Sequence, residues 1–265
     1  MACLELQSLN LRIAGVTLIE NLNLEVETNE CWALLGKNGA GKTSLLHSII
    51  GINHCAEGMI KLNGQDQKII RRAELATRVG ILFQEGIEAL PTSVLETVML
   101  GRHPHTQSIL KDDPKDVEIA RRALKDLALE NLEHRLVDTL SGGERQRLAV
   151  AMLVAQMPQV YLLDEPSNHL DVANQVKLLS LLKLRISERF ACLLMATHDI
   201  NLAARFCDHV VLLMGNGAYL KGPRQEILTE DNLSTAYDCT VRSLTAGGKG
   251  GVGESLEEMT LFYPT

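Results

Sequence analysis

GKNGAGKT, residues 36–43, fits the pattern G-x-x-x-x-G-K-[ST] at every fixed position, and this loop decides the fold. The apolar run CWALLG (31–36) predicts a buried strand before it, and SLLHSIIGI (44–52) predicts a helix after it. Glycines let backbone N–H groups surround phosphate oxygens, and a helix N-terminus adds positive potential. A glycine-rich turn can arise by chance, but the flanking strand and helix favour a nucleotide-phosphate site.

The residue types of this loop predict separate roles. Lys42 is expected to reach the β- and γ-phosphates of a nucleotide such as ATP, and Thr43 is expected to bind Mg²⁺. The other predicted nucleotide contacts in and beside the loop are Gly36, Asn38, Gly39, Ala40, Gly41 and Ser44.

A pair of acids at the end of a second apolar run completes the predicted chemistry. VYLLDE (160–165) reads as a buried strand that ends in Asp164 and Glu165. Neighbouring strand residues point to opposite faces, but bending at the strand end can direct both carboxylates into one crevice. Asp164 is the predicted Mg²⁺ contact, and Glu165 is the predicted general base for the attacking water. Such a pair alone is more often part of a solvated loop; the upstream phosphate loop makes it informative.

The rest of the chain predicts an α/β fold. LELQSLNLRI (4–13) and TLIENLNLEVE (17–27) alternate like half-buried strands. SVLETVMLG (93–101) and KDVEIARRALKDLALENL (115–132) have helical periodicity, so residues of about 85–157 are interpreted as an inserted helical subdomain. ACLLMATHD (191–199) is another apolar strand, and a crossover helix precedes it, as in a doubly wound parallel sheet.

A second candidate anion-binding device lies about a hundred residues after the first, at LSGGERQR (140–147). Ser141 and Glu144 form the S-x-x-E pattern of a capping box, which alone predicts only a well-capped helix. The two glycines, Gly142 and Gly143, are not needed by a cap, but they suit close approach of the backbone to a phosphate.

The composition of the chain argues against some classes of function and of cellular location. The 265 residues are 46% hydrophobic and 22% charged, with a net charge of −7, which argues against nucleic acid as the main partner. No apolar run reaches the roughly 18 residues that span a bilayer, and the N-terminus does not resemble a signal peptide. The six scattered cysteines form no C-x-x-C pair and suit a reducing cytosol. Any membrane role is therefore expected to come through a partner.

Taken together, GKNGAGKT, Gln84, LSGGERQR, LLDE, SNHLD (167–171) and His198 resemble the ATP-binding cassette (ABC) ATPases in identity, order and approximate spacing. The resemblance covers nearly the whole chain. It implies a single nucleotide-binding domain over 1–265, with an N-terminal antiparallel β region, a RecA-like parallel core and the inserted helical subdomain. It also implies head-to-tail dimers in which the LSGG of one copy caps the γ-phosphate held by the loop of the other.

The resemblance gives further residues expected roles. Gln84 would contact Mg²⁺ or the attacking water, and His198 would contact the γ-phosphate. Ser141, with Gly142 and Gly143, would act in trans, and Asp171 would shape the dimer seam. The family commonly stacks adenine on an aromatic residue; the matching place here is near Ile13, where no aromatic residue is found, so loose base selectivity is expected.

Finer features are similar to the ATPase subunits of metal-chelate importers for cobalamin, iron-siderophore or haem. They are VMLGRHPH (98–105), LDVANQ (170–175), THDINLAARFCD (197–208) and RQEILTEDNLSTAY (224–237). EGIEALP (85–91) is less like that subgroup, so the cargo stays open. The expected partners are a second copy, a separate permease and, indirectly, a substrate-binding protein, with the chain peripheral on the cytoplasmic face of the inner membrane. The alternative is a soluble cassette that acts in assembly or regulation.

The tail contains a second glycine-rich stretch, GGKGGVGES (247–255). Glu254 stands where a phosphate-binding lysine would be needed, which reverses the charge of the site. We interpret it as a flexible loop between the strands TVRSL and MTLFYP of a C-terminal β extension, residues 240–265.

Overall fold

The computed structural model describes residues 2–52, 56–85, 87, 91–106, 113–168, 170–246 and 259–265. At the centre of this part of the chain is a six-stranded sheet in the order β10-β9-β3-β8-β7-β6. Its parallel strands are β3 (Cys31–Leu35), β6 (Val79–Leu82), β7 (Val160–Asp164), β8 (Cys192–Ala196) and β9 (His209–Gly215). The edge strand β10 (Ala218–Pro223) pairs antiparallel with β9.

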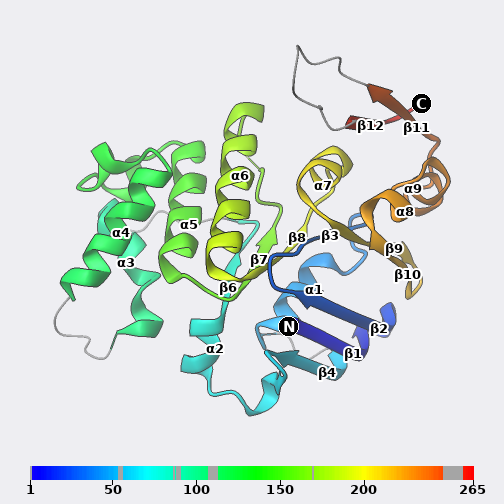
Figure 1. The fold of residues 1–265 in the computed structure, drawn as a ribbon, viewed down its shortest axis with the longest axis horizontal. Coiled ribbons are helices and arrows are strands. Elements are labelled where there is room, and N and C mark those ends of the chain that lie inside the picture. Colours follow the sequence, from blue (N-terminus) through cyan, green and yellow to red (C-terminus); the bar gives the residue numbers. More distant parts are fainter. Residues whose placement is uncertain are drawn as a thin grey trace.

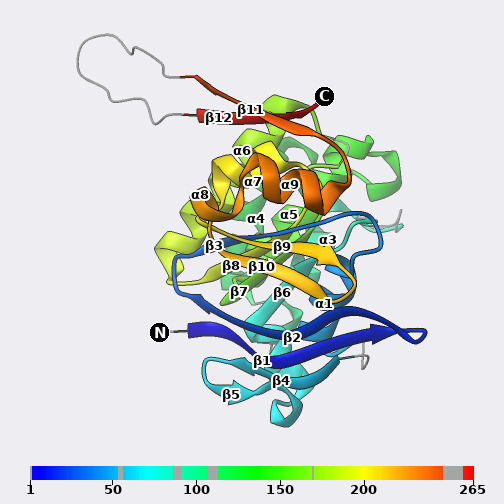
Figure 2. The ribbon, with the colours of Figure 1, turned by 90° about the vertical axis from the view of Figure 1, so that its right-hand side faces the viewer.

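The central sheet is covered on both faces, as its continuous apolar strands predict. Every residue of β7 is buried; Tyr161 and Leu163 belong to one core cluster, whereas Val160 and Leu162 belong to the other. Successive strand residues point to opposite faces, so one apolar run supplies both cores. Figure 2 shows the resulting layers, with helices above the sheet and a second sheet below it.

The layer below the central sheet is antiparallel and comes from the N-terminal part of the chain. It has the order β2-β1-β4-β5. Its strands are β1 (Ala2–Ile13), β2 (Val16–Glu27), β4 (Ala56–Leu62) and β5 (Gln65–Asp66). Helix α1 (Lys42–Ile49) contributes Leu45, Leu46 and Ile49 to the core between the two sheets. The chain therefore places the start of α1 beside the β1–β2 hairpin.

Helices cover the other face. They are α3 (Val94–Leu100), α4 (Pro114–Asp126), α5 (Gly142–Gln156), α6 (Val172–Arg189), α7 (Ile200–Phe206), α8 (Arg224–Ile227) and α9 (Glu230–Tyr237). α2 (Arg72–Arg78) precedes β6, and 3-10 turns lie at Gln67–Ile69, His103–His105, Glu130–Leu132 and Val137–Thr139. Among the described residues, no helix is both long and apolar enough to cross a bilayer.

Helices α3, α4 and α5 pack on one another at one end of the molecule (Figure 1). A buried ion pair joins them, because Arg102 Nε donates to Asp116 Oδ1 at 2.8 Å and Arg102 Nη1 donates to the Ala155 carbonyl at 2.7 Å. One predicted boundary was wrong: the helix expected over 115–132 ends at Asp126. Ala128 adopts a left-handed φ of 53°, which turns the chain so that Leu127 and Leu129 both enter the core.

The predicted α/β fold is confirmed, with its antiparallel N-terminal region and parallel core. The division into subdomains at 85–157 stays a prediction. At the C-terminus, β11 (Val241–Ala246) pairs antiparallel with β12 (Met259–Pro264), and α7 contacts β12. The predicted flexible loop GGKGGVGES lies outside the described residues.

Candidate functional site

The loop GKNGAGKT connects β3 to α1 in a conformation that requires glycine. Gly41 is the N-cap of α1 with a left-handed φ of 101°, and a Cβ there would lie 3.1 Å from the Cβ of Leu18. Gly36 has a φ of 149°, and a Cβ there would lie 3.0 Å from the Cβ of Leu213. A side chain at either position would strain the backbone and crowd the core.

Lys42, the first residue of α1, is buried and folded back over the loop. Its Nζ donates to the carbonyl oxygens of Gly36 at 2.7 Å and Lys37 at 3.1 Å. Burial lowers the pKa of the Lys42 ammonium, and the carboxylates of Glu165 and Asp164 oppose that shift. The ammonium thus stands between the loop that would hold phosphates and the two acids.

The two acids share one crevice although they are consecutive in the chain. β7 ends at Asp164, which pairs with Ala196 of β8, and Glu165 follows with a left-handed φ of 49°. The Glu165 amide donates to the Ala196 carbonyl at 2.9 Å, which fixes this bend. The bend is the physical reason that both carboxylates line the same cavity.

The two carboxylates have different surroundings. Asp164 is 1% exposed, and its Oδ2 has no hydrogen-bond partner within the described part of the chain. Desolvation raises the pKa of Asp164, with the Thr43 side chain opposing the shift. Glu165 Oε2 lies 2.8 Å from His198 Nδ1, and the Thr197 hydroxyl is 3.4 Å from the same oxygen. His198 keeps 63% of its side chain exposed, so its ring joins a buried acid to the solvent.

A cavity of about 580 Å³ brings most of the predicted site together. The predicted residues that line it are Ile13, Asn38, Gly39, Gly41, Lys42, Thr43, Ser44, Gln84, Asp164 and Glu165. A neighbouring hollow of about 270 Å³ shares Asn38, Gln84 and Glu165 with it and adds Asn168 and His198. Residues from five separate segments of the sequence therefore converge on one nucleotide-sized space.

The remaining predicted residues do not line this cavity. Gly36 and Ala40 form the body of the loop behind it. Ser141 is the N-cap of α5 in a complete capping box, in which the Glu144 amide donates to Ser141 Oγ at 3.3 Å. A Cβ on Gly142 would meet no atom within 4 Å. Asp171 is the N-cap of α6 and accepts from the Asn174 amide at 2.8 Å. Ser141, Gly142, Gly143 and Asp171 thus line neither the nucleotide cavity nor the smaller hollow of their own chain.

Comparison with known proteins agrees with this geometry. The ABC transporter family profile matches residues 19–168. The chain belongs to the ABC transporter family. It is 34% identical to the achromobactin transport ATP-binding protein of Dickeya dadantii, over 91% of this chain and 90% of that one. It is 33% identical to the ferric enterobactin transport ATP-binding protein of Escherichia coli, over 87% of this chain and 85% of that one.

A solved structure of an inward-facing ABC transporter, described as of metal-chelate type, has the same fold. It superposes on all of this chain and 98% of its own with a TM-score of 0.85, at 27% sequence identity. The resemblance to ABC ATPases is confirmed, and this ABC subunit binds ATP and is an ATPase of the transporter type. The roles given to single residues remain predictions, because nothing in these comparisons tests them.

Sequence reasoning missed two residues of the nucleotide cavity and one residue of the smaller hollow beside it. Val16 and Leu18 line it beside Ile13, because β1 and β2 pair through Ile13 and Val16 at the hairpin end. Val16 is an apolar residue at the end of a hairpin, and 60% of its surface is exposed. An exposed apolar residue at such a position can indicate a binding surface, and this signal could have identified Val16. Asn168 follows the acids by a few residues and lines the smaller hollow. These contacts depend on pairing and bending that the linear pattern does not specify.

Proposed function

We propose that this chain is the ATP-hydrolysing subunit of a binding-protein-dependent importer for a metal chelate. The observation that carries the proposal is the cavity that gathers the phosphate loop, both acids, Gln84 and, through the adjoining hollow, His198. The cargo class follows the relatives, whose names include achromobactin, ferric enterobactin and cobalamin transport. Iron-siderophore or cobalamin chelates are therefore the proposed cargo.

The residues of the cavity fit a magnesium nucleotide. The buried and unpaired Oδ2 of Asp164 needs a donor or a cation, and Thr43 supplies a hydroxyl beside it. Mg²⁺ held by Thr43, Asp164 and Gln84 would neutralise phosphate charge. Lys42 would exchange its bonds to the loop carbonyls for phosphate oxygens, while the aliphatic surface of Ile13, Val16 and Leu18 would support the adenine.

We assign the role of general base to Glu165, because its carboxylate contacts His198, a residue that is exposed to solvent. Glu165 would accept the proton of the attacking water through its carboxylate, with Oε2 held by His198 and Thr197. His198 would contact the γ-phosphate from its exposed side. Glu165 is 7% exposed, so competing bulk water is largely excluded from the carboxylate.

The second phosphate device completes the site only across a dimer. Ser141 and the two glycines after it lie at the start of α5, where Ser141 and Gly142 are exposed, and they line neither hollow of their own chain. Two copies related by a twofold axis would each place LSGG over the other's γ-phosphate, with Asp171 at the seam. ATP binding would close this dimer and hydrolysis would reopen it, because ATP binds the closed state better.

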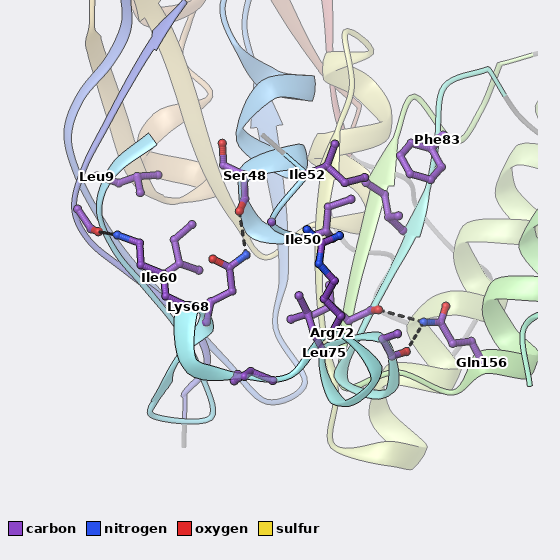
Figure 3. Close-up of a pocket in the computed structure, with 17 residues that line it drawn as sticks. Leu9, Ser48, Ile50, Ile52, Ile60, Lys68, Arg72, Leu75, Phe83 and Gln156 are labelled. Atoms are coloured by element: carbon purple, nitrogen blue, oxygen red, sulfur yellow. Dashed lines mark hydrogen bonds between the residues drawn. The ribbon is translucent and has the colours of Figure 1, made fainter. Parts of the chain in front are cut away.

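The proposed surface for the permease is a second cavity, of about 700 Å³, whose lining residues are drawn in Figure 3. It lies between the end of α1, β4, α2 and β6, and Ile52 and Phe83 line it with 59% and 39% of their surface exposed. Phe83 lines this cavity and the next residue, Gln84, lines the nucleotide cavity. A change at the phosphates can therefore be passed to a bound partner over one peptide unit. We place the chain on the cytoplasmic face of the inner membrane, held there by this contact.

The test is a mild-detergent pull-down of the full chain from its own membranes, with co-purifying proteins identified by mass. The proposal predicts a polytopic permease in equal number with this chain, and the binding protein of the same system identifies the cargo. Phe83→Glu should lose the permease and keep ATP binding, whereas Leu184→Glu, at an exposed position of α6, should keep both. Recovery only with soluble assembly proteins would refute the importer assignment and leave the ATP site intact.

A further inference from the structure

A third cavity, of about 300 Å³, lies on the helical side of the sheet and shares no residue with the nucleotide cavity. Its walls come from α4, the C-terminal ends of α5 and α6, and β7. Figure 1 shows α5 between α4 and α6 on this side of the molecule. The volume is at the lower end of the range of small-molecule sites, roughly 300–1,000 Å³. No step of ATP hydrolysis uses the residues of this cavity.

A buried hydroxyl in the wall lacks a hydrogen-bond partner. Tyr161 of β7 is 0% exposed, and its Oη contacts no donor or acceptor in the described part of the chain. Burial raises the pKa of Tyr161 to about 12, so the hydroxyl keeps its proton at neutral pH. Leaving a buried O–H group unpaired is unfavourable, and nearly all such groups in proteins have a partner. The hydroxyl is thus a donor that needs an acceptor.

Two guanidinium groups of α6 add further donors to the same wall. Arg185 Nη1 donates to Glu188 at 2.6 Å and Nη2 donates to Asp126, but its Nε is buried without an acceptor among the described residues. Arg189 has no carboxylate within ion-pair distance there, and its Nη1 faces only the sulfur of Met157. Both guanidinium groups act to lower the pKa of Tyr161, as positive charges near the hydroxyl must.

The arginines of the wall differ in their pairing. Arg122 of α4 lines the cavity but pairs with Glu118 at 3.0 Å, and the Asp126 and Glu188 carboxylates accept from Arg185. Arg189 is thus the arginine of this lining without a carboxylate partner among the described residues. A guanidinium group has no acceptor, so the arginines cannot satisfy one another's free N–H groups or give Tyr161 Oη an acceptor.

We propose that this cavity is a binding site for a small anion, which accepts hydrogen bonds from Tyr161, Arg185 and Arg189 through carboxylate or phosphate oxygens. Such a ligand supplies acceptors and negative charge together, which suits a donor-rich wall that contains an arginine without a carboxylate partner among the described residues. It would contact α4 on one side and α6 on the other, and so would oppose relative movement of these helices. The site is independent of the ATPase assignment.

The test is isothermal titration calorimetry on the full-length chain with saturating ADP, so that the phosphate loop is already occupied. The probes are citrate for the carboxylates and inorganic phosphate for the phosphates, with sodium chloride as the ionic-strength control. We expect one saturable site per chain for at least one probe. Tyr161→Phe and Arg189→Gln should each weaken it about tenfold, since hydrogen bonds to charged groups are strong.

Arg121→Gln is the matched control, because Arg121 is an exposed arginine of α4 outside the cavity wall. It should leave the affinity unchanged. Arg189 is exposed, so Arg189→Gln tests the site even if Tyr161→Phe does not fold. Absence of saturable heat with both probes, or binding that Arg189→Gln leaves intact, would overturn the proposal and leave water as the occupant. The probe that binds more tightly distinguishes a carboxylate ligand from a phosphate ligand.

Discussion

Replacing Asp164 with asparagine should stabilise the nucleotide-free chain while it abolishes ATP turnover. The carboxylate is 1% exposed, and Oδ2 has no partner in the described structure, so the Thr43 side chain offsets the cost of desolvation only in part. An unpaired buried polar group costs about 1–3 kcal/mol, and more when charged. The amide is neutral but still unpaired, so we expect a gain of about 1–2 kcal/mol. For a chain of this size that raises the Tm by about 2–6 °C.

The direction of the pKa shift of Asp164 predicts how the effect of Asp164→Asn on stability changes with pH. Burial raises the pKa of Asp164 in the folded state above its ordinary value of 3.8, so the folded chain binds this proton more tightly than the unfolded chain does. Protonation of Asp164 therefore contributes to the free energy of unfolding in full at a pH below the pKa of the unfolded state. This contribution is lost as the pH rises through the pKa of the folded state. The advantage of Asp164→Asn should therefore be smallest in acid and largest at neutral pH.

The assay is thermal unfolding followed by circular dichroism in EDTA, from about pH 3 to about pH 8, a range that spans the ordinary carboxyl pKa of aspartate and neutrality. Asp138→Asn is the control, because Asp138 is exposed and its change should leave the Tm unchanged at every pH. If Asp164→Asn melts at or below the wild-type temperature at neutral pH, the carboxylate is already well solvated or paired, and the reasoning from burial is refuted.

Three further changes test other parts of the molecule. Glu165→Gln should trap an ATP-bound dimer in light scattering, since water activation is lost and both phosphate devices remain; a nucleotide-bound monomer would contradict the trans role of LSGG. Ile13→Tyr should tighten ATP binding five-fold or more in a nucleotide titration, because base stacking contributes about 1–3 kcal/mol; unchanged affinity would exclude this position as the base platform. Arg102→Leu leaves Asp116 buried without its partner and should cost about 3–5 kcal/mol in urea unfolding, against about 1 kcal/mol or less for Arg121→Leu.

The sequence predicted the local parts of the site well. The phosphate loop, the acids after β7 and the cap of α5 each depend on residues within a few positions of one another. For the same reason the strand and helix types followed from periodicity. The end of α4 did not, because the buried residues Leu127 and Leu129 extend the apolar pattern beyond the left-handed turn at Ala128. An apolar pattern records burial, and a turn can bury its residues as well as a helix.

Features that join distant segments were not predicted. Val16 and Leu18 reach the nucleotide cavity only because the β1–β2 hairpin lies against the start of α1. In the sequence, Tyr161 is one more apolar residue of a buried strand, and only the structure shows that it lines a cavity with Arg185 and Arg189 and that its hydroxyl lacks a partner among the described residues. Such contacts depend on the order in which strands pair and on how helices pack, and the residue pattern of a single segment predicts neither.

The capping box of α5 has a consequence for the proposed dimer. The Ser141 hydroxyl has one proton, and its oxygen lies 2.7 Å from Glu144 Oε2, which also accepts from the Ser141 amide. A γ-phosphate from the other copy can receive that proton only if it displaces the carboxylate of Glu144, which is itself negative. Closure of the dimer is then a competition between the γ-phosphate and the Glu144 carboxylate for the hydroxyl proton of Ser141. In the isolated subunit Glu144 already accepts this hydrogen bond.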